Sequence, residues 1–548
     1  MIVIQLSNAS LVLGAQPIFT NLNWSIQHDQ KIGLIGANGA GKSSIFKLIM
    51  GEHSPEPGGL VVKAKGISLG YLAQQPELAP NDSTFTAALH GNPRWAELAG
   101  ELVRIENSLS DPEVYNDSKA LARALDAQQK YLEEYLALGG DDYPQQVGEI
   151  LAGLGLAKED FDKPVSKLSG GQKKLVGLAR LLLAKPDVVL LDEPDNHLDL
   201  AGKAFLEGLI NDYSGAVVIV SHDRYLLDSV VTHIAELEDG KIYTFKGDYS
   251  SYVIDKETRM ARAEELYQVQ QREIVRLEMA LKRYALWVQR SDKFTSRMHA
   301  MEARLARIEK RERPVLERRR MGLELNGWRG SNKVLELIGV EKSFQEQPVL
   351  LGIDALIRHG ERVGLIGANG AGKSVLLRLV LGREKADAGE IKIGPSVKIG
   401  YYAQEHETLD PEQTLIDAVR RGIPAGGSMS EANAVAFLNR YLFPYRMVTL
   451  PIRELSGGER SRLQLALLVL SGANFLLLDE PTNNLDIASA EVLENALEDF
   501  EGTVLVISHD RYFLDRTVNR ILLLDDGELV EFEGGYSDYA QKIAYQSM

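Results

Sequence analysis

Apolar residues of this chain follow two different patterns. Residues 32–35, 188–191 and 363–366 are short, continuous apolar runs, which are typical of strands buried on both faces of a parallel sheet. Other segments carry an apolar residue every three or four positions, which indicates the buried face of a helix. After the runs at 32–35 and 363–366, a few glycine-rich residues lead into a segment with helical spacing. Strands that alternate with helices in this way predict an α/β fold.

Much of this pattern occurs twice along the 548 residues. The repeated strings are GLIGANGAGKS at 33–43 and 364–374, LSGGQ or LSGGE at 168–172 and 455–459, and SHDRY at 221–225 and 508–512. A chain of this length is too long for one hydrophobic core. We therefore predict two homologous cassettes, at residues 1–250 and 333–548.

The first half carries an insertion. The offset between matching positions of the two halves is 330 at Gln74 and Gln404 but 287 from Leu168 and Leu455 onward. The first half therefore has about 43 extra residues between Gln74 and Leu168. Within the extra segment, helical spacing appears in two stretches, Trp95, Leu98, Leu102 and Ile105, and Leu121, Leu125, Leu132 and Leu136. The Asp111–Pro112 dipeptide between them favours a turn. We predict a helical arm at about residues 85–145.

Residues 251–332 have no counterpart in either repeat. Helical spacing places Ile274, Leu277, Leu281, Tyr284 and Val288 on one face and Met298, Met301, Leu305 and Ile308 on another. We predict two helices packed as an antiparallel coiled coil that links the cassettes. From residue 256 to 320 there are 18 Lys or Arg and 10 Asp or Glu, so this linker carries +8 while the whole chain carries −16.

Basic and aromatic residues flank the predicted tip of the linker. The side chains expected to contact RNA there are Lys282, Arg283, Arg290, Lys293 and Arg297. The other interpretation is an ordinary charged coiled coil whose aromatic residues pack between its helices. Composition alone does not separate the two.

Several classes of protein are excluded. The longest apolar runs fall far short of the roughly 18 residues that cross a bilayer, so we expect no membrane segment. The N-terminus lacks the charged start of a secretory signal, and the chain has no cysteine for disulfides or thiol-ligated metals. We therefore expect a cytoplasmic protein.

The repeated string fits the P-loop pattern, GxxxxGK[ST], between a predicted strand and a predicted helix. Its glycines let backbone N–H groups wrap a phosphate chain at the positive end of a helix, its Lys contacts the β and γ phosphates, and its Ser holds Mg²⁺. We therefore expect ATP and Mg²⁺ as ligands. The residues expected to bind ATP are Gly36, Asn38, Gly39, Gly41, Lys42, Ser43 and Ser44 in the first half and Gly367, Asn369, Gly370, Gly372, Lys373 and Ser374 in the second.

A carboxylate pair follows a buried apolar run in each half, at the edge where open α/β sheets bind ligands. Asp192 and Asp479 are the candidates for the carboxylate that binds Mg²⁺, either directly or in its second coordination sphere. The residues after them, Glu193 and Glu480, are the candidates for the general base that activates the attacking water. A structural ion pair is the alternative, and the recurrence in both halves argues against it.

These motifs resemble the ABC ATPase family throughout both cassettes. The resemblance implies two composite sites, each formed when the P-loop of one cassette meets the LSGG segment of the other across ATP. It also implies that His222 and His509 sense the γ-phosphate and that both sites hydrolyse ATP. The first site would combine Lys42, Ser43, Gln74, Asp192, Glu193 and His222 with Ser456, Gly457, Gly458 and Glu459. The second would combine Lys373, Ser374, Gln404, Asp479, Glu480 and His509 with Ser169, Gly170, Gly171 and Gln172.

Some positions depart from the family pattern. The resemblance implies that Phe344 stacks on adenine at the second site and that Gln74 and Gln404 join the metal ligands, but Leu13 stands where the first site would have an aromatic residue. After the first DEP, Asp195 replaces the usual Thr, whereas the second half keeps Thr482. The sequence leaves open whether Asp195 slows one site.

The insertion, the basic linker, and LDEPxNxLD with SHDRYxLD in both halves resemble the ABC-F subfamily. That resemblance implies a monomer whose cassettes pair within one chain. It implies binding to the ribosome, where the linker enters near the tRNA exit site and reaches large-subunit rRNA and peptidyl-tRNA. An ATPase acting on branched DNA is the alternative, and the energy subunit of a transporter a more remote one. Whether the role is housekeeping control of translation, rescue of stalled ribosomes or antibiotic resistance stays open.

Overall fold

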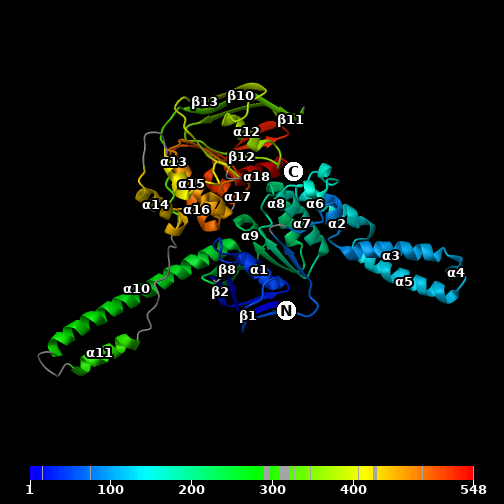
Figure 1. Ribbon diagram of the computed structural model, residues 1–548, viewed down its shortest axis with the longest axis horizontal. Coiled ribbons are helices and arrows are strands. Elements are labelled where there is room, and N and C mark those ends of the chain that lie inside the picture. The colour runs from blue at the N-terminus through cyan, green and yellow to red at the C-terminus, as the bar shows by residue number, and fades with distance from the viewer. Residues whose placement is uncertain are drawn as a thin grey trace. The chain divides into compact units, whose positions relative to one another are not determined.

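The computed structural model describes residues 1–14, 16–73, 76–288, 295–307, 321–325, 328–345, 347–404, 407–423, 429–483 and 485–546. It contains two compact units, one made of residues 1–248 with 321–548 and the other of residues 249–320 (Figure 1). The first unit holds both cassettes. No helix in the described part of the chain is long and apolar enough to cross a membrane.

Each cassette is built around a six-stranded, mainly parallel sheet of the same topology. The first has the order β5-β6-β7-β3-β8-β9 and the second β14-β15-β16-β12-β17-β18, with only the last strand antiparallel in each. The strands of the first are β3 (Lys31–Ile35), β5 (Leu69–Leu72), β6 (Val188–Asp192), β7 (Ala216–Val220), β8 (His233–Glu238) and β9 (Lys241–Lys246). Those of the second are β12 (Arg362–Ile366), β14 (Ile399–Tyr402), β15 (Phe475–Asp479), β16 (Thr503–Ile507), β17 (Arg520–Asp525) and β18 (Glu528–Glu533).

The three apolar runs of the sequence analysis lie inside these sheets. Every residue of β6, β7, β15 and β16 is buried, because helices or a second sheet cover both faces. A three-stranded antiparallel sheet covers one face in each cassette. These sheets contain β1 (Ile2–Leu13), β2 (Gln16–Gln27) and β4 (Leu60–Lys63), and β10 (Lys333–Phe344), β11 (Gln347–Arg358) and β13 (Ala388–Ile393). The predicted α/β class is therefore confirmed.

Helices connect the strands at positions that repeat between the cassettes. One core lies between the antiparallel sheet, the P-loop helix and the central sheet, with Phe46 and Leu190 fully buried in the first cassette. The paired helices are α1 (Lys42–Met50) and α12 (Lys373–Val380), α7 (Gly170–Ala184) and α15 (Gly457–Leu470), α8 (Leu200–Asn211) and α16 (Ile487–Glu498), and α9 (Arg224–Val230) and α17 (Arg511–Thr517). The remaining helices are α2 (Thr84–Leu89), α6 (Tyr143–Gly153), α13 (Leu415–Arg421), α14 (Glu431–Arg440) and α18 (Tyr536–Gln546).

The inserted arm is a helical hairpin, as the sequence predicted. Helices α3 (Pro93–Leu109) and α5 (Ser118–Ala137) pack on each other, and the short α4 (Pro112–Tyr115) lies at the turn with Asp111 as its cap (Figure 1). Trp95 anchors the base of the arm, where its ring stacks on Tyr135 with centroids 5.8 Å apart. However, Leu125, Leu132 and Leu136 are exposed rather than buried, because each helix of a hairpin has only one partner to cover it.

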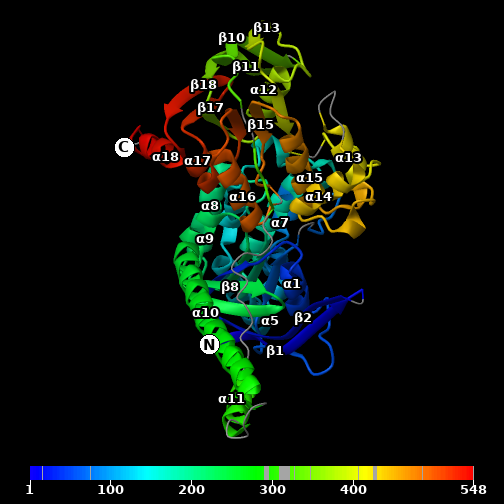
Figure 2. The ribbon, with the colours of Figure 1, turned by 90° about the vertical axis from the view of Figure 1, so that its left-hand side faces the viewer.

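The second unit is formed by α10 (Tyr249–Val288) and α11 (Thr295–Arg307), which pack side by side (Figure 1). Figure 2 shows the same helices from the left-hand side of that view, where they overlap. Arg304 of α11 donates a hydrogen bond to Glu273 of α10 at 2.7 Å, a pairing that requires the two helices to run antiparallel. Ile274 and Leu277 are buried as their spacing predicted. The side chains of Tyr284 and Val288, and all of Ile308, lie outside the described residues.

Candidate functional site

Both P-loops have the backbone that a phosphate cradle needs. Gly36 and its counterpart Gly367 have φ of 153°, and a Cβ on either would lie 2.6 and 2.3 Å from the carbonyl oxygens of Leu237 and Leu524. Only glycine avoids this clash, so the loop lies directly against β8 or β17 and turns sharply into the helix. Since α1 and α12 begin at the P-loop Lys, the positive ends of both helices face the loop.

The two P-loop lysines are held in the same way. Lys42 Nζ donates to the carbonyl oxygens of Gly36 at 2.7 Å and Ala37 at 3.1 Å. Lys373 Nζ makes the matching bonds to Gly367 at 2.7 Å and Ala368 at 2.8 Å. Both side chains are buried, and this burial lowers the pKa of each ammonium. A buried cation at the start of a helix is suited to an anionic ligand such as a phosphate chain.

Asp192 and Asp479 end the fully buried strands β6 and β15. The P-loop serine of the same cassette lies beside each carboxylate, Ser43 beside Asp192 and Ser374 beside Asp479. Burial raises the pKa of both carboxylates, to about 6 for Asp479, while the serine hydroxyl acts to lower it. One oxygen of each has no hydrogen-bond partner among the described atoms.

This oxygen donor set fits Mg²⁺. A serine hydroxyl beside a carboxylate with an unpaired buried oxygen offers the hard ligands that Mg²⁺ prefers. No group of three or more His, Cys, Asp or Glu that could hold a metal lies in the described part of the chain. Mg²⁺ in nucleotide sites usually takes one or two protein ligands and fills the rest of its coordination with phosphate oxygens and water, and one serine with one carboxylate fits that pattern.

The glutamates that follow, Glu193 and Glu480, have strained backbones. Their φ angles are 52° and 48°, in the left-handed region that non-glycine residues rarely adopt. The backbone N–H of each donates to the next strand, Glu193 to Val220 at 2.8 Å and Glu480 to Ile507 at 2.9 Å. This pairing holds the side chains at the ligand-binding edge of the sheet. Burial, followed by the neighbouring Asp479, raises the pKa of Glu480 to about 8, and burial also raises the pKa of Glu193.

A histidine faces each glutamate from the end of the next strand. His509 Nε2 lies 3.5 Å from Glu480 Oε1, and the backbone N–H of His509 donates to Glu480 Oε2 at 3.3 Å. His222 Nε2 lies 4.0 Å from Glu193 Oε1. Burial, then the charge of Lys42, lowers the pKa of His222 to about 4, and burial lowers the pKa of His509 well below its usual value. Both imidazoles are therefore neutral near pH 7.

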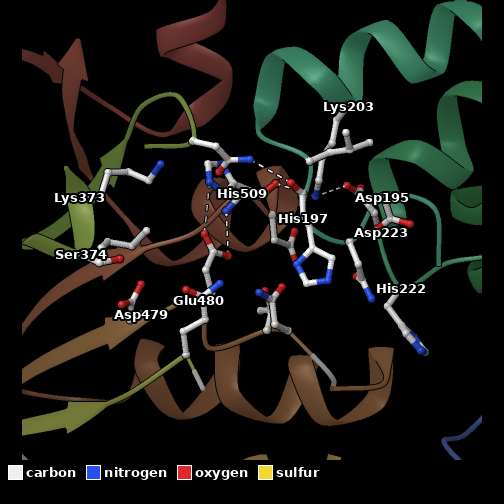
Figure 3. Close-up of a pocket in the computed structure, with 18 of the residues that line it drawn as sticks. Asp195, His197, Lys203, His222, Asp223, Lys373, Ser374, Asp479, Glu480 and His509 are labelled. Atoms are coloured by element: carbon white, nitrogen blue, oxygen red, sulfur yellow. Dashed lines mark hydrogen bonds and ion pairs between the residues drawn. The ribbon is translucent and has the colours of Figure 1, made fainter. Parts of the chain in front are cut away.

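A cavity of about 330 Å³ opens at the second P-loop (Figure 3). Lys373, Ser374, Gln404, Glu480 and His509 contribute to its wall from the second cassette. The first cassette contributes the residues Asp195, His197, Lys203, His222 and Asp223. This volume is in the range of pockets for small molecules, and the cavity joins groups from both halves of the chain.

Each P-loop contacts an aspartate of the opposite cassette that the sequence analysis did not single out. Asn369 N donates to Asp199 Oδ2 at 3.1 Å, and Asn38 N donates to Asp486 Oδ2 at 3.2 Å. Asp199 and Asp486 also cap the helices α8 and α16. They stand at the same place in both repeats, just after the DEP segment, so their recurrence was the signal that could have identified them.

The LSGG segments begin the helices α7 and α15. Ser169 and Gln172 form a capping box, as do Ser456 and Glu459, so both serine hydroxyls stand at a helix N-terminus as expected. A Cβ on Gly171 would lie 3.0 Å from the ring of His197, which itself lines the cavity. The pairing of each P-loop with the LSGG segment of the other cassette across ATP stays a prediction.

The structure describes only some of the other residues that the sequence analysis expected to bind adenine, RNA or Mg²⁺. Phe344 is 41% exposed, which leaves a ring face open for stacking, and Lys342 Nζ lies 5.2 Å from its centroid. Lys282 and Arg283 are exposed on α10. Gln74, Arg290 and Lys293 lie outside the described residues, as does the side chain of Arg297.

The chain is similar to known proteins over nearly its whole length. Residues 19–196 and 350–483 match the protein family described as ABC transporter, and residues 235–323 match a second family with the same description. The chain is 37% identical over 536 residues to the energy-dependent translational throttle protein EttA of Escherichia coli, with 96% of this chain and 92% of that protein covered. It is 30% identical over 531 residues to ABC transporter F family member 5 of Arabidopsis thaliana, with 96% and 75% covered.

A solved structure shares the fold. The archaeal ribosome recycling factor aABCE1, in complex with the ribosomal stalk protein aP1, superimposes with a TM-score of 0.62 over 98% of this chain and 92% of that one. The sequence identity is 18%, so this likeness concerns the fold alone.

Proposed function

Because the chain belongs to the ABC-F family of tandem ATP-binding-cassette proteins, which hydrolyse ATP, we propose that it acts on the ribosome. It binds the ribosome when ATP has closed its two cassettes on each other. The unit 249–320 then modulates translation near the tRNA exit site, where it contacts large-subunit rRNA and peptidyl-tRNA. The printed name of the Escherichia coli relative, a translational throttle, supports translation as the process. Such a role places the protein in the cytoplasm.

The observation that carries this proposal is the surface of α10. Three arginines, Arg272, Arg276 and Arg283, line a shallow depression together with the apolar side chains of Val275 and Met279. Met279 is 62% exposed, so its side chain is open to a ligand beside the arginines. Guanidinium groups bind phosphates and stack on bases, and apolar side chains contact base faces, so the surface is suited to RNA.

The charge of the rest of the chain makes this contact local. Outside residues 256–320 the chain carries −24, which repels RNA. Binding therefore depends on the basic unit and on the state of the cassettes. If about six phosphates are engaged, an increase in salt from about 50 to about 200 mM lowers the affinity by roughly 10³.

Each proposed catalytic residue has one task at its site. Glu193 and Glu480 accept the proton of the attacking water, and His222 and His509 contact the γ-phosphate as neutral donors. Lys42 and Lys373 bind the β and γ phosphates. When bound, Mg²⁺ neutralises charge on the phosphate oxygens, and its proposed ligands are Ser43, Asp192 and Gln74 at the first site and Ser374, Asp479 and Gln404 at the second.

Co-sedimentation with ribosomes tests the proposed function. A Glu193→Gln, Glu480→Gln variant, which retains ATP, is expected to pellet with ribosomes when ATP is present and to lose this binding at about 200 mM salt. Replacing Lys282 and Arg283 by Glu is expected to weaken the binding. The matched control is the change of Lys241 and Lys246, two exposed lysines of β9, to Glu. Equal pelleting with and without ATP would contradict the proposal, and pelleting only with branched DNA would favour the DNA alternative.

A further inference from the structure

Lys203 of the first cassette reaches into the second ATP site. It lies on α8, is only 7% exposed, and its Nζ lies 2.8 Å from Asp223 Oδ2 (Figure 3). The same ammonium donates a hydrogen bond of 2.8 Å to the backbone carbonyl of His509. The side chain therefore crosses from one cassette to the proposed γ-phosphate sensor of the other.

A buried ammonium needs compensating charge, and three carboxylates supply it. Asp223 is in direct contact with Lys203, and Asp195 and Asp510 act on it through their charge. Burial by itself would lower the pKa of Lys203, but these carboxylates outweigh it and the pKa is raised. Lys203 therefore stays charged near neutral pH.

The repeat provides a comparison within the same chain. At the offset of 287, Lys203 corresponds to Ala490 and Asp195 to Thr482, whereas Asp223 corresponds to another aspartate, Asp510. The first cassette therefore has both the cation and one extra carboxylate, and the second has neither. Helix α16 has Ala490 at the position that corresponds to Lys203. His222 of the first site therefore has no lysine at the matching position of the second cassette.

The two proposed bases accordingly have different neighbours. Glu193 accepts a hydrogen bond from Asn196 Nδ2 at 2.7 Å, and its backbone carbonyl accepts one from Lys174 at 2.6 Å. Both donors belong to its own cassette. Each glutamate faces a histidine, His222 at 4.0 Å and His509 at 3.5 Å, but the carbonyl of His509 also accepts a hydrogen bond from Lys203 of the opposite cassette.

We propose that Lys203 is a positioning residue for the second ATP site: by holding His509 against Glu480 from across the cassette interface, it makes hydrolysis there dependent on the first cassette. The first site has no such dependence on the second cassette at this position. The inference rests on the proposed roles of Glu480 and His509. It makes the two sites unequal, with the second one active only when α8 of the first cassette is in place.

Site-specific single turnovers test this dependence. Glu193→Gln leaves the second site as the working one, and Glu480→Gln leaves the first. In each background Lys203 and Asp195 are replaced together, as Lys203→Ala with Asp195→Thr. This pair restores the residues that the second cassette has at the same places, so the variant removes the cation without leaving Asp195 unpaired.

The expected result is a difference between the backgrounds. Rapid quench measures the rate of the first turnover, and this rate is expected to fall about tenfold or more in the Glu193→Gln background, with the KM for ATP changed less than twofold. In the Glu480→Gln background the same pair is expected to change the rate less than threefold. A residue that only supported the fold would lower both rates alike.

Two results would overturn the inference. One is an equal loss in both backgrounds, and the other is an unchanged rate in the Glu193→Gln background. The Lys203→Arg variant adds a second readout, because a retained cation at this position is expected to restore at least part of the rate lost at the second site. Failure of the base assignment is distinguishable, since the Glu193→Gln, Glu480→Gln variant would then still hydrolyse ATP whatever residue stands at 203.

Discussion

Arg224 of the first cassette and Glu494 of the second form a buried ion pair across the cassette interface. The pair is repeated in the opposite sense by Arg511 and Glu207, at positions that correspond through the offset of 287. Each arginine also lies over a tyrosine ring of the other cassette, Arg224 over Tyr512 at 3.8 Å and Arg511 over Tyr225 at 5.0 Å. The interface is therefore built on a pseudo-twofold arrangement, and Lys203 departs from it.

Glu494 is expected to matter more than Arg224 to the docking of the cassettes. Glu494 also pairs with Arg516 at 3.0 Å, so its removal takes a buried carboxylate partner from Arg224 and one of the two carboxylate partners of Arg516, which keeps Glu498. Loss of Arg224 instead leaves Glu494 paired with Arg516. We expect Glu494→Gln to lower the free energy of unfolding by about 3 to 5 kcal/mol and Arg224→Leu by less. Denaturant titration measures both, with the exposed Glu501→Gln as control. Equal losses would contradict this account of the ion-pair network.

Hydrolysis at the second site is expected to increase with pH. A base must be ionised, and the pKa of Glu480 is raised to about 8, so the rate in a Glu193→Gln background should increase between pH 7 and pH 9. Because the imidazole of His509 is already neutral, it adds no inflection near pH 6.5. The measurement is a single-turnover rate against pH. An inflection below pH 6 would show that Glu480 is not the titrating group.

The same group predicts how stability depends on pH. Glu480 has a folded pKa above its unfolded value, so its contribution to stability is present below about pH 4.5 and is lost as pH rises through about 8. Glu480→Gln is expected to flatten the fall in the free energy of unfolding over this range. Denaturation at several pH values compares this variant with the exposed control Glu501→Gln. Parallel curves would rule out this linkage.

Removal of Lys203 alone is expected to destabilise the chain. Lys203→Met leaves Asp195, Asp223 and Asp510 buried together without the ammonium, and we expect a loss of about 3 to 5 kcal/mol in the free energy of unfolding. The added change Asp195→Thr removes one of these carboxylates and should recover part of the loss. A double-mutant cycle over positions 195 and 203 measures the coupling. Additive effects would mean that the two residues do not interact.

Gly36→Ala is expected to abolish ATP binding at the first site. Its new methyl group would lie 2.6 Å from the carbonyl oxygen of Leu237, and a strand backbone cannot move away without disturbing the sheet. The control is Gly66→Ala, a turn glycine at φ 82° with open space around it, where the cost is only the strain of about 1 kcal/mol. Binding of a fluorescent ATP analogue to a Lys373→Ala background isolates the first site. Unchanged affinity would exclude a tight P-loop around Gly36.

The sequence predicted the features that repeat or follow a period. Buried strands such as β6 could be recognised because a sheet covered on both faces needs a continuous apolar run, and the P-loops because their glycines have a local backbone task. The arm followed from the change in repeat distance. Its exposed leucines, Leu125, Leu132 and Leu136, were not predicted, because helical spacing identifies an apolar face and not whether a neighbour covers it.

The cross-cassette contacts could not be derived from spacing alone. Asp199 and Asn369 are 170 positions apart, and nothing local in either segment indicates that they meet. Asp195 was recognised as a departure from the repeat, but its partner Lys203 was not, since a lone Lys on a helix usually lies in solvent. A comparison of each position with its repeat would have revealed that the two replacements, at 195 and 203, occur together.

Asp199 and Asp486 each cap a helix of one cassette and accept an N–H of the other cassette's P-loop. Asp199 thus links the first turn of α8 to the second P-loop, and Asp486 links the first turn of α16 to the first P-loop. A displacement of either P-loop would therefore act directly on a helix of the opposite cassette, and the central sheets would not have to transmit it. Each P-loop is therefore coupled through a single carboxylate to the N-terminus of a helix in the opposite cassette, and the coupling runs in both directions.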